Sequence, residues 1–196
     1  MNLVCNNCVG ARMYELSNKQ FNNPFTWCAI TISDFVKLIQ RFNEIDFYNI
    51  KIYLEYHFRE YQTICAELDD IKLHYVHYIY KDCDLCKKKP DVFGNIIIQY
   101  FTETYYRRLN RMIIENEIPT FLLTYNYTQK KDKNYMNCLM ELIKLNDNHI
   151  YIFAHKDNIQ NINANSETNL IGFDDNIMEL NGIDFSNMNK HYFFNE

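Results

Sequence analysis

Apolar residues recur every three or four positions in four stretches of the chain, which is the spacing of one helix face. The clearest stretch is "TISDFVKLIQRF", where Phe35, Leu38 and Phe42 share a face and Thr31 or Ser33 can cap the helix. The same reading predicts three further helices, over 9–18, over about 96–116 with a stop at Pro119, and in "YMNCLMELIKLN".

Apolar and polar residues alternate instead in "IKIYLEYHF", "YQTICAEL" and "IKLHYVHYIY", which is the pattern of strands. Only Asp69 and Asp70 separate the last two, so we expect a hairpin with an Asp-Asp turn. Residues 81–95, which carry Pro90 and Gly94, are expected to form an exposed loop. Short apolar stretches predict further extended segments, at Leu3–Asn6, "PFTWCAI", "TFLLTYNY", "HIYIFAH" and "NLIGFDD".

The second half of the chain alternates helix, strand, helix, strand, which favours parallel strands joined by helical crossovers. We therefore predict an α/β fold, with mixed α+β as the alternative. The expected architecture is a single domain with a central, mostly parallel sheet flanked by helices, together with the Asp-Asp hairpin. Residues 1–155 would form the core domain, and the Asn-rich residues 156–196 would pack on it or trail from it.

Composition narrows the class of protein. The chain has 196 residues, 47% of them hydrophobic, which is enough for a sizeable core. Its net charge of -5 argues against a nucleic-acid partner, because such proteins neutralise phosphates with a basic excess. No apolar run has the roughly 20 residues of a membrane span, and we expect no secretory signal. Seven cysteines, an odd number, favour reduced thiols and a cytoplasmic location, and the abundance of Tyr, Asn, Ile and Lys indicates an AT-rich genome.

The stretch "LVCNNCVGARMYEL" allows several interpretations of Cys8. If a helix begins near Val9, its dipole would stabilise a Cys8 thiolate and make it a nucleophile. Asn6 and Asn7 tolerate tight turns and offer donors to a developing oxyanion. Residue statistics favour the simpler alternative, in which Cys8 is a small buried thiol.

A cysteine nucleophile needs a base, and "IKLHYVHYIY" offers two histidines. Alternation places His74 and His77 on opposite faces of a strand. His77 lies nearer the carboxyl end of the strand, where sites in α/β sheets usually open, so we prefer it as the base. A hydrogen-bonded interior histidine is an equally good interpretation.

Two other side chains could bind a substrate. Arg107 and Arg111 each have a glutamate four residues away, so ordinary surface ion pairs explain them. Arg108 lies at the edge of the apolar stripe instead, where its planar guanidinium could hold a phosphate or carboxylate. Trp27, the single tryptophan, could form the floor of a ligand pocket, although its position next to Pro24 and Phe25 favours packing in the core or at its rim.

Metal binding is a further possibility, because Cys5/Cys8 and Cys83/Cys86 both have the CxxC spacing of zinc ligands. The two pairs are far apart in sequence and lack the turn glycines of zinc ribbons. Zinc would also remove Cys8 from catalysis. We therefore expect no metal in the main site, and keep a shared four-cysteine site as the alternative.

The order of "NNC", "PFTW", "HYVHY", "YYRRLNRM" and "TFLLTYN", over roughly residues 3–155, resembles an uncharacterised family named for papain-like cysteine peptidases. It also resembles the related family of exopolysaccharide biosynthesis proteins. By this resemblance Cys8 matches the family cysteine, His77 with Tyr78 the histidine pair, and Arg108 an arginine of the helix. The chain departs from the pattern at Thr26 and Tyr78, where the peptidase-like family has aspartates, so no orienting residue for His77 is identified.

The resemblance implies a transferase in surface-glycan or exopolysaccharide biosynthesis that moves an acyl group, such as acetyl, onto a sugar or nucleotide-linked sugar. Acetyl-CoA is the candidate acyl donor, and no other cofactor is assigned. The alternatives are a papain-like peptidase or amidase, a nucleotide-sugar glycosyltransferase, and a non-catalytic binding module. The expected site contains Cys8, His77 and Asn7 for catalysis and Asn6, Trp27, Tyr78 and Arg108 for substrate binding.

Overall fold

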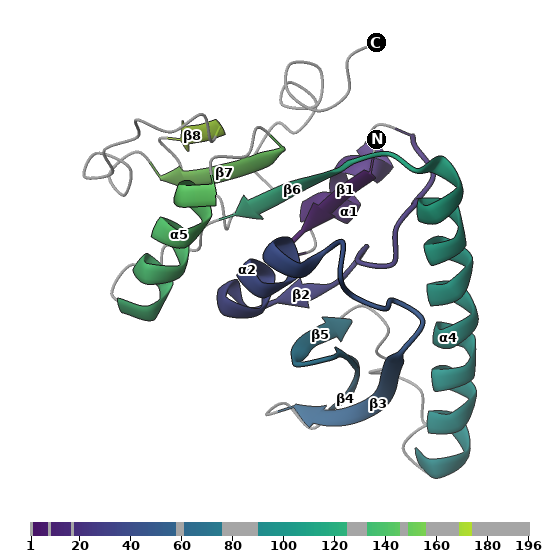
Figure 1. The fold of residues 1–196 in the computed structure, drawn as a ribbon. Coiled ribbons are helices and arrows are strands. Elements are labelled where there is room, and N and C mark those ends of the chain that lie inside the picture. Colours follow the sequence, from purple (N-terminus) through teal and green to yellow (C-terminus); the bar gives the residue numbers. More distant parts are fainter. Residues whose placement is uncertain are drawn as a thin grey trace.

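Two four-stranded sheets and the helices around them form the described part of the chain (Figure 1). The structure is a computed structural model that describes residues 2–7, 9–16, 18–57, 61–75, 90–124, 133–145, 149–155 and 169–173. In chain order the elements are β1 (Asn2–Cys5), α1 (Val9–Leu16), β2 (Ala29–Ile30), α2 (Ile32–Arg41), β3 (Ile50–His57), β4 (Tyr61–Leu68), β5 (Ile71–Tyr75), α4 (Pro90–Glu115), β6 (Pro119–Thr124), α5 (Lys133–Leu145), β7 (Ile150–His155) and β8 (Asn169–Phe173).

One sheet is parallel and has the strand order β1-β6-β7-β8. The predicted parallel pairing in the second half of the chain is therefore confirmed, and so is the strand predicted in "NLIGFDD". Cys5 pairs with Leu122, and β6 continues to Thr124. Because all strands point the same way, the ends of β1 and β6 meet at one edge, which we call the carboxyl edge.

The second sheet is antiparallel and has the order β2-β5-β4-β3. Leu68 of β4 pairs with Ile71 of β5, and Asp69 and Asp70 lie between them. Asp69 has a φ of 54°, a left-handed conformation that aspartate tolerates in turns. The chain is thus a mixed α+β protein, in which the predicted parallel sheet is accompanied by a separate antiparallel one.

Helix α2 forms as its sequence predicts. The Thr31 side chain accepts a hydrogen bond from the backbone N of Asp34 at 3.2 Å and thereby caps the first turn. Phe35 and Leu38 are buried, as their spacing indicates. Phe35 also contacts Phe121 of β6, with ring centroids 6.3 Å apart, so α2 packs against the parallel sheet.

Two local predictions are wrong. Helix α4 begins at Pro90 rather than near residue 96. Proline is favoured in the first turn of a helix, and the absence of a side chain at Gly94 lets this turn lie close to Leu54 of β3. The Pro24–Trp27 stretch of "PFTWCAI" is a turn, and the chain is in a strand only at Ala29–Ile30. Trp27 has a φ of 61° there, which no propensity rule anticipates for tryptophan.

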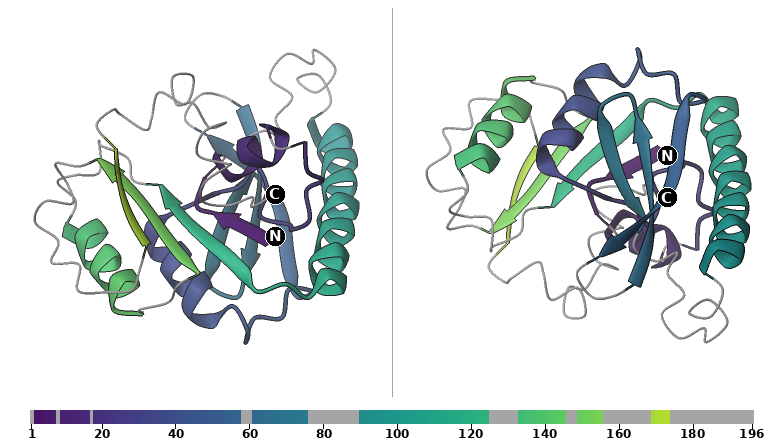
Figure 2. Two further views of the ribbon diagram at one scale, coloured as in Figure 1. Left: turned by 90° about the horizontal axis from the view of Figure 1, so that it is seen from above. Right: turned by 90° about the horizontal axis from the view of Figure 1, so that it is seen from below.

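Both sheets and three of the helices contribute to one hydrophobic core. Figure 2 shows α4 and α5 at opposite sides of the molecule, with the strands between them. Within the described residues no helix is both long and apolar enough to cross a membrane.

Candidate functional site

The turn that follows β1 is fixed to the end of β6 at the carboxyl edge. Asn6 Oδ1 accepts hydrogen bonds from the backbone N of Thr124 at 2.9 Å and from its Oγ1 at 3.3 Å. Asn7 Nδ2 donates to the same Thr124 Oγ1, and Cys5 Sγ donates to Asn7 Oδ1 at 3.4 Å. The contacts with Thr124 span more than a hundred residues of sequence, so they hold the turn in one conformation.

The start of α1 lies close against β1 because residue 10 is a glycine. A Cβ on Gly10 would be 2.7 Å from the Cβ of Cys5, which is closer than real atoms approach. Helix α1 begins at Val9, as predicted. Cys5 is buried, with 3% of the residue exposed, whereas Cys8 lies outside the described residues.

The segment from Thr26 to Ile30 connects this turn to α4. At one end, the backbone N of Ile30 donates to the carbonyl of Asn6 at 2.8 Å. At the other end, Arg108 Nη1 donates to the carbonyl of Thr26 at 3.4 Å. Trp27 lies between them and is half-buried. The structure therefore brings three of the predicted residues, Asn6, Trp27 and Arg108, to a single five-residue segment.

Arg108 is a buried cation, with only 8% of the residue exposed. Its guanidinium carbon lies 5.1 Å from the centroid of the Phe21 ring, a cation–π arrangement. Among the described residues no carboxylate lies within ion-pair distance of it. A buried guanidinium with a single long hydrogen bond to a carbonyl can receive an anionic group.

A buried polar network supports the segment, and no motif or periodic pattern predicts it directly. Tyr14 OH accepts a hydrogen bond from the backbone N of Leu3 at 2.9 Å and donates to Asn22 Oδ1. Asn23 Nδ2 donates to the carbonyl of Leu3 at 2.8 Å. Burial raises the pKa of Tyr14 far above its usual value, so the phenol stays protonated as a donor. The pair of asparagines before Pro24 was the available clue.

The remaining predicted residues are His77 and Tyr78, and both lie outside the described residues, as does the Cys83/Cys86 pair. His74, the other histidine of the stretch, lies on β5 and is partly exposed on the face of the sheet opposite the core.

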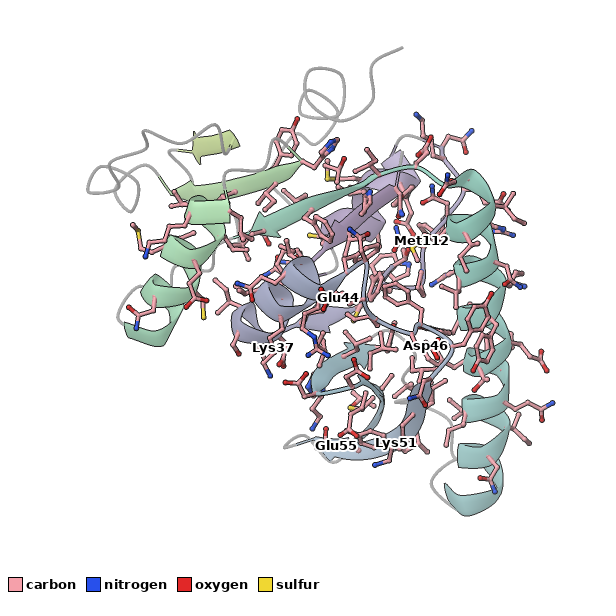
Figure 3. The ribbon with its side chains drawn as sticks, viewed as in Figure 1. Lys37, Glu44, Asp46, Lys51, Glu55 and Met112 are labelled. Atoms are coloured by element: carbon pink, nitrogen blue, oxygen red, sulfur yellow. The ribbon has the colours of Figure 1, made fainter. Side chains whose placement is uncertain are left out.

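A cleft of about 580 Å³ opens at the other end of the parallel sheet, near the first residues of β1 and β6. Phe47, Met112 and Phe121 are among its lining residues, and Figure 3 labels Met112 at the upper part of α4. Asn2 also lines it, and its buried Oδ1 has no hydrogen-bond partner among the described residues. This cleft therefore lies near the amino ends of β1 and β6, away from the predicted site.

Comparison with known proteins covers the first part of the chain. Residues 1–88 match the model of a family described as a domain of unknown function, DUF1919. The match includes the Asn6–Asn7 turn, Trp27 and the antiparallel sheet, and it ends before Arg108 and β6. No curated protein matches the chain. The chain is therefore similar to an uncharacterised family over this region, and that family's description carries no activity.

Proposed function

We propose that the chain is a transferase of surface-glycan biosynthesis that moves an acyl group onto a sugar, with Cys8 as nucleophile and His77 as base. The observation that carries this proposal is the fixed turn at the carboxyl edge. In open α/β sheets, ligands bind beyond the carboxyl ends of the strands, and Cys8 follows that turn directly in sequence.

The beginning of α1 at Val9 supports a reactive thiol at position 8. Unpaired N–H groups and the dipole at a helix N-terminus favour a thiolate over a thiol. Asn6 and Asn7 both hydrogen-bond to Thr124, so we assign them to positioning this turn rather than to direct contact with an oxyanion. Catalysis through an oriented nucleophile requires such fixed surroundings.

The proposed reaction has two steps. The Cys8 thiolate attacks the carbonyl carbon of an acyl thioester, and the thiolate of the donor leaves with a proton from protonated His77. A sugar hydroxyl then attacks the acyl-enzyme while His77 accepts the hydroxyl proton, and Cys8 leaves as a thiolate. Arg108, a buried cation beside the Thr26–Ile30 segment, would bind a phosphate of the donor or of a nucleotide-linked sugar.

Intact mass spectrometry after incubation with acetyl-CoA tests the first step. We expect a gain of one acetyl group in the wild type and none in Cys8→Ala. Cys138→Ala is the matched control, because Cys138 is buried on α5, and this variant should be acetylated normally. If Cys8→Ala and His77→Ala both retained full acyl transfer, the thiol mechanism would be wrong.

A papain-like peptidase or amidase would use the same nucleophile, so the fixed turn supports it as the second candidate. In that case water would hydrolyse the acyl-enzyme, and no sugar acceptor would be needed. Labelling of Cys8 by iodoacetamide that a peptide-like inhibitor blocks would favour hydrolysis. Discharge that depends on an added sugar or nucleotide-linked sugar would favour the transferase.

A further inference from the structure

A cluster of three potential metal ligands lies on the antiparallel sheet, on the face opposite the core. Along β4, Ile64, Ala66 and Leu68 belong to the core. Cys65 therefore points to the other face, since neighbouring residues of a strand alternate. Glu55 of β3 and His74 of β5 share this face, because Cys65 pairs directly with His74 and Glu55 pairs with Thr63.

The side chains of these three residues meet. Cys65 Sγ lies 3.3 Å from His74 Nδ1 and 3.2 Å from Glu55 Oε2. His74 Nδ1 and Glu55 Oε2 are 3.9 Å apart. One ligand atom from each of three adjacent strands thus forms a triangle, and Figure 3 labels Glu55 on this part of the sheet.

We propose that Glu55, Cys65 and His74 form a zinc-binding site. In a tetrahedral zinc centre the metal lies about 2.3 Å from sulfur and about 2.0–2.1 Å from nitrogen or oxygen, so sulfur should be about 3.5 Å from the other two atoms and nitrogen about 3.3 Å from oxygen. The measured 3.3, 3.2 and 3.9 Å differ from these values by about 0.6 Å at most. Small side-chain rotations on a fixed sheet would complete the geometry.

The donor set selects the metal. A thiolate with an imidazole and one carboxylate suits zinc, whereas magnesium and calcium prefer oxygen ligands alone. Lys72 Nζ donates to Glu55 Oε1 at 2.8 Å, which leaves Oε2 facing Cys65. A hydrogen bond of this kind fixes the orientation of the carboxylate, as the hydrogen-bond partners of metal ligands do in metal sites.

The described residues supply three protein ligands to this site, and it is open to water. Cys65 is fully buried, but the side chains of Glu55 and His74 are 41% and 26% exposed. Water can therefore reach the centre and supply a fourth ligand. Three protein ligands with one open position is the arrangement of catalytic rather than structural zinc. In the metal-free protein, burial and the neighbouring Glu55 raise the pKa of the Cys65 thiol to about 12, and the thiol then donates to the carboxylate.

Zinc titration against a chromophoric chelator, after the protein has been stripped of metal, tests this proposal. We expect one zinc ion per chain in the wild type and at least a ~10-fold weaker affinity in His74→Gln and in Cys65→Ser. Two variants serve as controls: Cys138→Ala should bind like the wild type, and so should the double variant Cys83→Ser/Cys86→Ser. His74→Gln is the decisive variant if Cys65→Ser fails to fold, because His74 is partly exposed.

Cobalt substitution identifies the ligands independently. A thiolate–cobalt charge-transfer band should appear in the wild type and in Cys83→Ser/Cys86→Ser, and should disappear in Cys65→Ser. Absence of zinc binding would overturn the proposal and leave a hydrogen-bonded polar triad. If His74→Gln kept the zinc affinity of the wild type and the Cys83→Ser/Cys86→Ser variant lost it, the CxxC pairs would be the zinc ligands and the proposal would be overturned. Neither outcome depends on acyl transfer by Cys8.

Discussion

Lys37 and Arg41 of α2 hold the Asp70 carboxylate between β4 and β5. Lys37 Nζ lies 2.8 Å from Asp70 Oδ2, and Arg41 Nη1 lies 2.5 Å from Oδ1. The hydrogen bond from Lys37, followed by the one from Arg41, lowers the pKa of Asp70 from 3.8 to about 2. Because the folded pKa is depressed, the stabilisation is complete above the unfolded pKa of 3.8 and is lost as the pH falls through 2.

We expect the carboxyl carbon of Asp70 to titrate in an NMR experiment with a midpoint near 2. Lys37→Ala should move that midpoint upward, because it removes the largest stabilising contact of the carboxylate. Lys51→Ala is the control, since Lys51 pairs with Glu67 instead. A wild-type midpoint at the ordinary value of 3.8 would contradict the ion-pair geometry.

Tyr14 is expected to stabilise the fold through its hydroxyl. Tyr14→Phe would leave the backbone N of Leu3 and Asn22 Oδ1 without this partner in a buried environment. We expect the free energy of unfolding to fall by about 1–3 kcal/mol in urea denaturation. Tyr106→Phe is the matched control, because its exposed hydroxyl bonds only to a surface carbonyl, and it should change stability by less than about 0.5 kcal/mol. Equal stability of the two variants would refute the role of the network.

The sequence singles out candidate residues where local chemistry is sufficient. Asn6, Trp27 and Arg108 were selected for their side-chain types, and they do lie along one segment. Thr124 was missed, since its partnership with Asn6 depends on the parallel pairing of β1 with β6 across most of the chain. Neither the 3.6-residue period of helices nor the two-residue period of strands predicts which distant strands pair.

At the scale of elements, Gly10 sets the distance between α1 and β1. Gly10→Ala would place a Cβ 2.7 Å from the Cys5 Cβ, an atom that cannot rotate away. We expect a loss of about 1–3 kcal/mol in the free energy of unfolding, despite the better helix propensity of alanine. Gly94→Ala is the control, because its new Cβ would meet only the terminal Cδ1 of Leu54, which can move. A Gly10→Ala variant as stable as Gly94→Ala would contradict this close packing.

The cap of α2 is a second test at this scale. Thr31→Ala removes the acceptor for the backbone N of Asp34, so thermal or urea unfolding should show a loss of about 1 kcal/mol. Thr31→Ser keeps the hydroxyl and should restore most of the stability. If serine were no better than alanine, the loss would come from the methyl group rather than from capping.

Elements with a clean period were predicted correctly, among them α2, the strands β3 and β4, and β5 over its described residues Ile71–Tyr75. The start of α4 was not, because Pro90 and Gly94 are loop residues by propensity. Proline is also favoured in the first turn of a helix, and Gly94 lies close to Leu54 of β3, so the same residues fit a helix once it packs on that strand. The division into two sheets also escaped prediction, since periodicity assigns residues to strands but not strands to sheets.

At the scale of the whole molecule, aromatic residues join the parallel sheet to the rest of the core. Phe121 of β6 is buried and contacts Phe35 of α2 and Phe42, the C-cap residue of that helix, with ring centroids 6.3 and 5.3 Å apart. Phe42 in turn contacts Phe47, 5.0 Å away, on the connection to β3. The side chains of both sheets therefore belong to one continuous apolar cluster. A shared core of this kind makes the two sheets unfold together.

Phe121→Ala tests this coupling. We expect a loss of about 3–5 kcal/mol, because the substitution leaves a cavity between α2 and β6. Two probes report on different regions: Trp27 fluorescence follows the segment beside the antiparallel sheet, and far-UV circular dichroism follows all the strands and helices. If one core joins the sheets, both probes should give the same urea midpoint in the wild type and should shift equally in the variant. A circular-dichroism transition that shifts while the Trp27 midpoint stays unchanged would show that the sheets unfold independently.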